Sequence, residues 1–233
     1  TNLTVDSGSM ISADNQGVMI GPGTMTDNRS GGSYGGKGYT AEESYVYGSA
    51  IYPKDLGRGG AIQREYHKGG GAIWLEVSDT ITNTGVISAN GGQSSSGGSV
   101  YVNTKNLDGS GVFRANGGGL ASTAIFYFPG GGGRTAIHYD NSSFTGDVEA
   151  NYGSGHVGYP DLNVGEGGTA GLFDKKNNIL YIDNDWEFTV EDSPFTIDKI
   201  VVSGMAKVRF QEDAEIDIGD FVVDEMSELI LTG

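Results

Sequence analysis

The sequence of 233 residues contains no cysteine, and its 14 lysine and arginine residues are outnumbered by 30 aspartate and glutamate residues. The absence of cysteine excludes a disulfide scaffold and thiolate metal sites. The shortage of basic residues leaves a formal net charge of −16, and so negative a surface repels nucleic-acid phosphates and anionic membranes. We therefore expect no nucleic acid among the partners of this chain.

Long apolar runs are also missing, since no stretch approaches the ~20 apolar residues of a membrane span. We therefore expect no membrane insertion. The length still allows a sizeable core in one large or two ordinary domains. Both ends of the chain have the pattern of a strand, so we expect the chain to be part of something longer.

Glycine, by contrast, is abundant, with 41 residues. These glycines follow no strict triplet period, which excludes collagen. Valine, isoleucine, tyrosine and phenylalanine recur periodically between them, and this pattern argues against disorder.

One phrase recurs in residues 70–91, 97–117 and 133–153, and its second half opens the chain in residues 3–17. Each copy begins with glycine, continues as a short alternating strand, a polar turn and a second strand, and ends in Ala-Asn. Internal repetition with a period in the twenties is typical of a solenoid.

From residue 169 the glycine content falls and a second repeat of 21 residues aligns 200–210 with 221–231. Strands are expected here at 179–182, 186–190, 195–202, 205–210, 215–223 and 228–231. We divide the chain into glycine-rich coils in 1–168, with a tyrosine-rich excursion at 21–71, and acidic coils of shorter period in 169–233 that continue the same solenoid.

The expected fold is all-β, a right-handed parallel β-helix with long glycine-rich loop excursions. A β-sandwich is the alternative, because Asn90-Gly91 and Asn116-Gly117 resemble hairpin turns. These dipeptides recur at the same point of each repeat, which favours a stacked turn. We expect Asn90, Asn116 and Asn151 to form a structural ladder of amides, with Asn15 as a further member.

Several segments carry a family resemblance: GGAIWLEV, TGVISANGG, GGSVYV, LDGSGVFRANGG and GGGGRTAIHYD. Over roughly residues 3–154 the chain resembles the glycine-rich β-helix repeats of very large secreted or surface proteins of bacteria. The resemblance implies an extracellular or cell-surface, adhesin-like module. It carries over no catalytic residues, and this chain departs from the pattern in its charge and in its tyrosine-rich excursion.

Strand alternation predicts which side chains of the repeats point outward. We expect two outward columns, Trp74, Tyr101 and His138 in the first and Glu76, Asn103 and Asp140 in the second. Rings cover the apolar faces of sugars, and carboxylates and amides bind hydroxyls, so the columns indicate a carbohydrate site. The alternative is that the rings only stabilise neighbouring strands.

The tyrosine-rich excursion is a second candidate for ligand binding, through Tyr45, Tyr47 and Tyr52. A tyrosine can bury its ring while its hydroxyl stays in water. These side chains therefore either line a glycan groove or seal the excursion onto the coil.

An enzyme is a third hypothesis. Arg134 with His138, Asp140 and Glu76 would suit a polysaccharide lyase or glycoside hydrolase, although no nucleophile elbow, HExxH motif or P-loop is present. We assign no catalytic residue.

Calcium is the ion that the composition favours, because hard cations bind oxygen ligands. The candidate ligands are Asp183, Asp185, Asp161 and Glu166, which are equally well explained as solvated acidic turns. The sequence as a whole predicts a non-catalytic extracellular adhesion module that binds a polysaccharide or a cell-surface glycan. The alternative is a structural stalk or fibre subunit that associates end to end.

Overall fold

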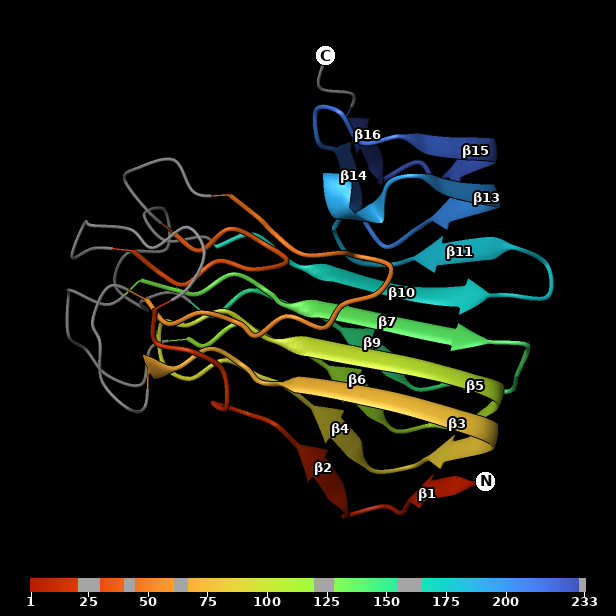
Figure 1. Ribbon diagram of the computed structural model, residues 1–233, viewed down its shortest axis with the longest axis horizontal. Helices are drawn as coiled ribbons and strands as arrows, with labels where there is room; N and C mark the ends of the chain where they lie inside the picture. Colours follow the sequence, from red (N-terminus) through yellow and green to blue (C-terminus); the bar gives the residue numbers. More distant parts are fainter. Residues whose placement is uncertain (21–29, 40–44, 61–66, 120–127, 155–164, 231–233) are drawn as a thin grey trace.

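The computed structural model describes residues 1–20, 30–39, 45–60, 67–119, 128–154 and 165–230 (Figure 1). This part of the chain is nearly all β and forms three sheets in which parallel pairing predominates. The helix whose residues are all described is η2, a single 3-10 turn at Val190–Asp192, and no helix in this part of the chain is long and apolar enough to cross a membrane. The expected all-β class is confirmed.

The largest sheet contains nine strands, which are stacked from β1 at the bottom of Figure 1 to β15 at the top. Its order is β1 (Leu3–Val5), β3 (Ala72–Asn83), β5 (Ser99–Gly109), β7 (Arg134–Tyr139), β10 (Thr169–Asp174), β11 (Ile179–Ile182), β13 (Phe195–Val202) and β15 (Ile216–Val223), with β8 (Asn141–Ser142) also paired to β5. We call it the main sheet.

Two smaller sheets are built from the second strand of each repeat. The first comprises β2 (Met10–Ser12), β4 (Val86–Ser88), β6 (Val112–Arg114) and β9 (Asp147–Glu149). The second comprises β12 (Trp186–Phe188), β14 (Lys207–Phe210) and β16 (Glu228–Ile230). Because successive repeats pair in parallel, equivalent residues of the phrase lie beside one another.

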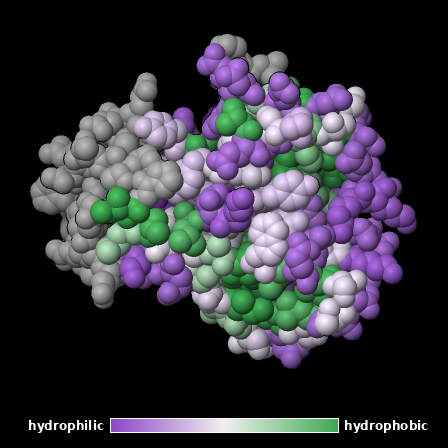
Figure 2. All heavy atoms as spheres, viewed as in Figure 1, coloured by the Kyte–Doolittle hydropathy of each residue, from purple (hydrophilic) through white to green (hydrophobic). Residues whose placement is uncertain are grey.

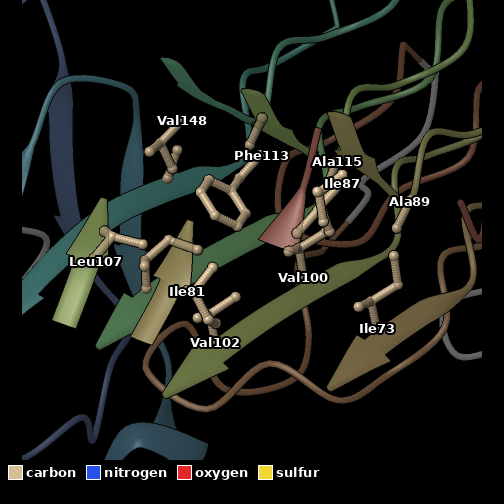
Figure 3. Packing of buried hydrophobic residues seen from close by; sticks show 14 of the residues in the cluster. Ile73, Ile81, Ile87, Ala89, Val100, Val102, Leu107, Phe113, Ala115 and Val148 are labelled. Carbon is tan, nitrogen blue, oxygen red and sulfur yellow. The ribbon is translucent and has the colours of Figure 1, made fainter. Parts of the chain in front are cut away.

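The inward side chains of the repeats form a first core between the main sheet and the β2–β4–β6–β9 sheet (Figure 3). Val100 and Ile137 from the main sheet are fully buried there, as are Ile87 and Phe113 from the facing sheet. The alternation of apolar residues in the sequence correctly places these side chains, because successive residues of a strand point to opposite faces.

The core changes face at β10. Ala170 and Leu172 of this strand contact the first core, whereas Phe173 belongs to a second core on the other face of the main sheet. The pair β10–β11 is the one antiparallel pair among the described strands. The chain thus continues the same sheet past residue 168, but it reverses direction and encloses its second core on the opposite face. This junction departs from the simple continuation that the sequence led us to expect.

Each repeat closes through one recurring backbone contact. The carbonyl oxygens of Ala13, Ala89, Ala115 and Ala150 accept hydrogen bonds of 2.6–2.8 Å from the N–H groups of Gly71, Gly98, Gly133 and Gly168, respectively. A Cβ atom added at Gly132 would lie 1.9 Å from the oxygen of Ala150. The equivalent distances at Gly70 and Gly97 are 1.9 and 2.0 Å. The glycine pair that opens each phrase is therefore required by close approach of the backbone.

Glycine-rich segments outside the strands pack side by side where the strands β3, β5, β7 and β10 begin, at the left of Figure 1. We call these segments the glycine body, which comprises residues 31–38, 57–60, 69–71, 91–98, 117–119 and 130–133. Its segments are joined directly by backbone hydrogen bonds, for example from Gly97 N–H to the oxygen of Gly131 (3.1 Å) and from Gly131 N–H to the oxygen of Gly32 (2.9 Å). These buried polar groups are therefore satisfied without regular sheet pairing.

The asparagine ladder is present at the turn after the short strands. The side-chain oxygen of Asn90 accepts from the N–H of Asn116 (2.9 Å), and that of Asn116 accepts from the N–H of Asn151 (2.8 Å). The first rung belongs to Asp14, whose carboxylate accepts from Asn90 N–H at 2.6 Å, and not to Asn15 as expected. Asn15 has a φ of 56°, whereas the three ladder residues have no positive φ. Their role is to supply an acceptor and not to adopt a left-handed turn.

We expect Asn116→Ala to lower the free energy of unfolding by about 1 kcal/mol, because the N–H of Asn151 loses its acceptor. The variant also removes the bond from Asn116 Nδ2 to the carboxylate of Glu149 (2.7 Å). Chemical denaturation measures the change. Asn151→Ala is the matched control, because the side chain of Asn151 accepts no hydrogen bond from the described residues. Equal losses of stability in the two variants would show that the acceptor of Asn116 does not stabilise the turn.

Candidate functional site

The strand register decides which outward side chains meet. Trp74 pairs with Tyr101, which pairs with Ala136, while Asn103 pairs with His138. The pairs Trp74–Tyr101 and Glu76–Asn103 are therefore in register as expected, whereas the placement of His138 in the first column and of Asp140 in the second is wrong. The run of four glycines lets Arg134 pair with Ser99, so β7 lies two residues away from the expected alignment. A shift of two residues preserves the face of every side chain.

Asp140 follows β7 and lies beside Lys105, to whose carbonyl oxygen it donates its N–H (3.1 Å). The second column observed is Glu76, Asn103, His138 and Phe173. The members on β3 and β5 are polar, and those on β7 and β10 are aromatic.

Two rings at the site are about half exposed, Trp74 at 46% and Tyr52 at 49%. The ring of Trp74 stacks on Tyr101 with a centroid distance of 3.9 Å and an interplanar angle of 25°, and Tyr101 itself is buried. Tyr101 therefore supports the ring of Trp74 from beneath, and only the ring of Trp74 is open to solvent in this pair. We call the exposed ring of Trp74 the platform.

A line of rings continues from this platform along the sheet. His138 lies 5.2 Å from Tyr101, and Phe173 stacks on His138 at 4.2 Å and 4°. Tyr52 stacks on His138 at 5.4 Å and remains half exposed. Tyr101, His138 and Phe173 lie on β5, β7 and β10, whereas Tyr52 comes from a segment that is distant in the sequence.

That distant segment, residues 45–52, covers the outward face of the main sheet, and we call it the strap (orange in Figure 1). Arg134 donates from Nε and Nη2 to the carbonyl oxygen of Tyr47, at 3.1 and 2.9 Å. His138 Nε2 lies 2.9 Å from the carbonyl oxygen of Ile51, which can only accept, so this nitrogen carries the proton. Both side chains point outward as predicted but are buried beneath the strap.

The buried carboxylate of Asp192, in η2, fixes the other side of the strap. It accepts hydrogen bonds from Ser49 Oγ (2.6 Å) and from the N–H of Ile51 (3.1 Å), and on its own side from the N–H of Thr189 (2.8 Å). The strap thus joins β7 of the main sheet to η2.

Of the three tyrosines predicted to bind a ligand, some border the groove and others seal the excursion onto the sheet. Tyr52 borders the site, whereas Tyr47 donates its hydroxyl to the carbonyl oxygen of Leu56 (2.8 Å) and packs against Tyr34. Tyr45 is exposed but lines neither of the hollows described below. Most of this segment therefore seals the sheet.

Beside the Trp74 platform lies a groove formed by two hollows of about 340 and 240 Å³, which share Asn103 and Lys175. The first is lined mainly by polar groups, including Glu76 and Asp140, and the second has an aromatic floor that includes His138. Hydrophilic residues gather over the carboxyl-terminal ends of β5, β7 and β10, at the right of Figure 2.

A chain of polar contacts crosses the groove. Asn103 Nδ2 donates to Glu76 (2.8 Å), and its oxygen accepts from Lys175 Nζ (2.6 Å). Lys175 also forms an ion pair with Asp140 at 3.3 Å. Our reading of the sequence missed Lys175, because it lies in the β10–β11 turn and no motif marks it.

The electrostatics of the groove keep two of its groups neutral. Burial, followed by the nearby Glu76 carboxylate, raises the pKa of Tyr101 to about 12, so its hydroxyl stays protonated. Burial lowers the pKa of His138 to about 4, although the hydrogen bond to Ile51 acts in the opposite direction. His138 is therefore uncharged at neutral pH.

The grouping expected for a lyase is not assembled. Arg134 lies beneath the strap, 5.4 Å from the Tyr34 ring centre, and lines neither hollow. The cation that faces Glu76 and Asp140 is Lys175 instead.

The candidate calcium ligands do not form a site in the part of the chain that the structure describes, which holds no group of three or more acidic or histidine side chains suited to a metal. Asp185 accepts a hydrogen bond from Lys207 N–H (3.0 Å), and burial raises the pKa of both Asp183 and Asp185. The backbone oxygen of Glu166 accepts from Gly132 N–H (3.0 Å). Asp161 lies outside the described residues.

No protein-family model matches the sequence, and comparison with curated proteins and with solved structures finds no similar protein. The function must therefore be argued from the groove itself.

Proposed function

We propose that this chain is a non-catalytic carbohydrate-binding module of an extracellular or cell-surface protein, and that the groove beside Trp74 is its binding site. The observation that carries the proposal is an exposed indole ring, stacked on Tyr101, next to a fixed chain of hydrogen-bonding groups. The resemblance of the repeated phrase to bacterial surface proteins supports the location.

Trp74 suits the apolar face of a sugar ring. Its ring is half exposed and already held by Tyr101, so little side-chain freedom is lost when a ligand stacks on it. Glu76 and Asn103 lie in the adjacent column of the same strands, where a carboxylate and an amide can bind the hydroxyls at the edge of that sugar.

We further propose that the strands follow a right-handed parallel β-helix, at least through residue 154. Support comes from the alternation of the chain between the main sheet and the β2–β4–β6–β9 sheet, with parallel pairing in each. Crossovers between parallel strands are right-handed in nearly all known sheets. Such a fold would display the groove on a rigid face.

Trp74→Ala is expected to weaken glycan binding by about tenfold to a hundredfold, because the ring provides the apolar contact. Binding is measured by a glycan array followed by calorimetry on the strongest hit. Trp74→Phe should restore part of the affinity. Tyr181→Ala should leave the affinity unchanged. It removes an exposed aromatic ring on the other face of the main sheet, since its neighbours Leu180 and Ile182 belong to the second core with Tyr101. An array without hits, or equal affinity of Trp74→Ala and the unmodified protein, would overturn the proposal.

A further inference from the structure

Lys175 is held by three oxygen atoms of the groove. Its Nζ lies 2.6 Å from Asn103 Oδ1, 3.1 Å from the carbonyl oxygen of Thr104 and 3.3 Å from Asp140 Oδ1. An ammonium group has three N–H donors and no acceptor. Two of these donors are therefore used in hydrogen bonds to Asn103 and Thr104, and the positive charge of Lys175 is paired with the carboxylate of Asp140.

The other charged groups along the groove are mainly carboxylates. Glu76 and Asp140 border the first hollow and Asp174 borders the second, against the cations Lys105 and Lys175. Glu76 accepts one described hydrogen bond, from Asn103, whereas a carboxylate offers about four acceptor positions. The groove thus presents acceptors for hydroxyl or amine groups, on a chain whose net charge is −16.

We infer that the groove selects uncharged or amine-bearing sugars and rejects glycans that carry carboxylates, and that Asp140 sets this selectivity by neutralising the charge of Lys175. The inference rests on the proposed function. A carboxylate placed here would meet three carboxylates, Glu76, Asp140 and Asp174, against two cations, of which Lys175 is already paired with Asp140. Juxtaposed like charges disfavour binding.

Asp140 is the residue whose loss should reverse the preference. Asp140→Ala removes the ion-pair partner of Lys175 and makes the groove more positive by one charge. Lys175 would still be held by Asn103 and Thr104, so the shape of the groove is retained. The same site should then accept a uronate carboxylate.

The experiment compares oligoglucosides with oligoglucuronides, and oligogalactosides with oligogalacturonides, each pair matched in length, by array and calorimetry. The unmodified protein should bind the neutral member of a pair at least about tenfold more tightly. In Asp140→Ala this ratio should fall to about threefold or less, through a gain in binding of the acidic member.

Asp220→Ala is the matched control. It removes the same charge from an ion pair with Lys199 (3.4 Å). Asp220 lies on β15, which does not line the groove, so the variant should keep the original ratio. Equal or tighter binding of the acidic glycans by the unmodified protein would overturn the inference while leaving the proposed function intact, as would identical shifts in the two variants. Absence of binding to every glycan would instead overturn the proposed function, and the inference with it.

Discussion

Replacement of Gly132 by alanine is expected to lower the free energy of unfolding by about 3 kcal/mol or more. The added Cβ would lie 1.9 Å from the oxygen of Ala150 and 2.3 Å from the nitrogen of Gly168, which are themselves hydrogen-bonded at 2.6 Å. All of these are backbone atoms, so no side chain can turn aside to relieve the contact. The strands that meet at this corner would have to move apart.

Gly167→Ala provides the comparison within the same region. A Cβ there would meet nothing closer than 3.4 Å, the side-chain oxygen of Asp185, so the change should stay within about 0.5 kcal/mol. Chemical denaturation followed by circular dichroism measures both variants. If Gly132→Ala unfolds at the same denaturant concentration as Gly167→Ala, the close packing of the corner is not what the fold requires.

Acidification from pH 7 to pH 4 is expected to cost the fold about 3 kcal/mol through His138 alone. An unfolded chain binds the proton with a pKa near 6.5, whereas burial holds the pKa of this side chain at about 4 in the folded protein. Between these two values the unfolded state binds more protons, so stability falls as the pH falls. The contribution is complete above the unfolded pKa, and the loss is complete below about pH 4.

Carboxylates titrate in part of the same range, and His138→Gln separates their effect from that of the imidazole. Glutamine keeps an N–H donor for the carbonyl oxygen of Ile51 but does not titrate. It loses the stacking on Phe173, so its stability at pH 7 should be lower than that of the unmodified protein. The difference between the two proteins should shrink steadily from pH 6.5 to pH 4. Parallel stability curves across that range would show that His138 is not buried in the neutral form.

Both predictions concern contacts that reach across the chain, and they show where sequence reasoning was sufficient. The inward positions of Ile73, Val100 and Ile137 could be predicted, because side chains alternate strictly along a strand. The corner of alanine and asparagine could also be predicted, since the same residues recur at the same point of each phrase. Local periodicity and repetition together determined the all-β class and the face of each side chain.

The site was predictable only in part. Trp74, Glu76 and Asn103 lie at the groove on the expected face, but Arg134 and His138 are buried, because the strap from residues 45–52 crosses above them. Nothing local in the sequence around residue 138 indicates that a segment almost ninety positions earlier supplies the carbonyl oxygen of Ile51.

The sequence by itself determined the repeating strands, their buried faces and the corners that join them, because each of these depends on residues only a few positions apart. Only the tertiary structure decided the register of β7, the reversal at β10–β11 and the arrival of Lys175 beside Asn103. These features depend on which distant segments pair, and a shift of two residues or a change of strand direction leaves the local alternation of apolar residues unchanged.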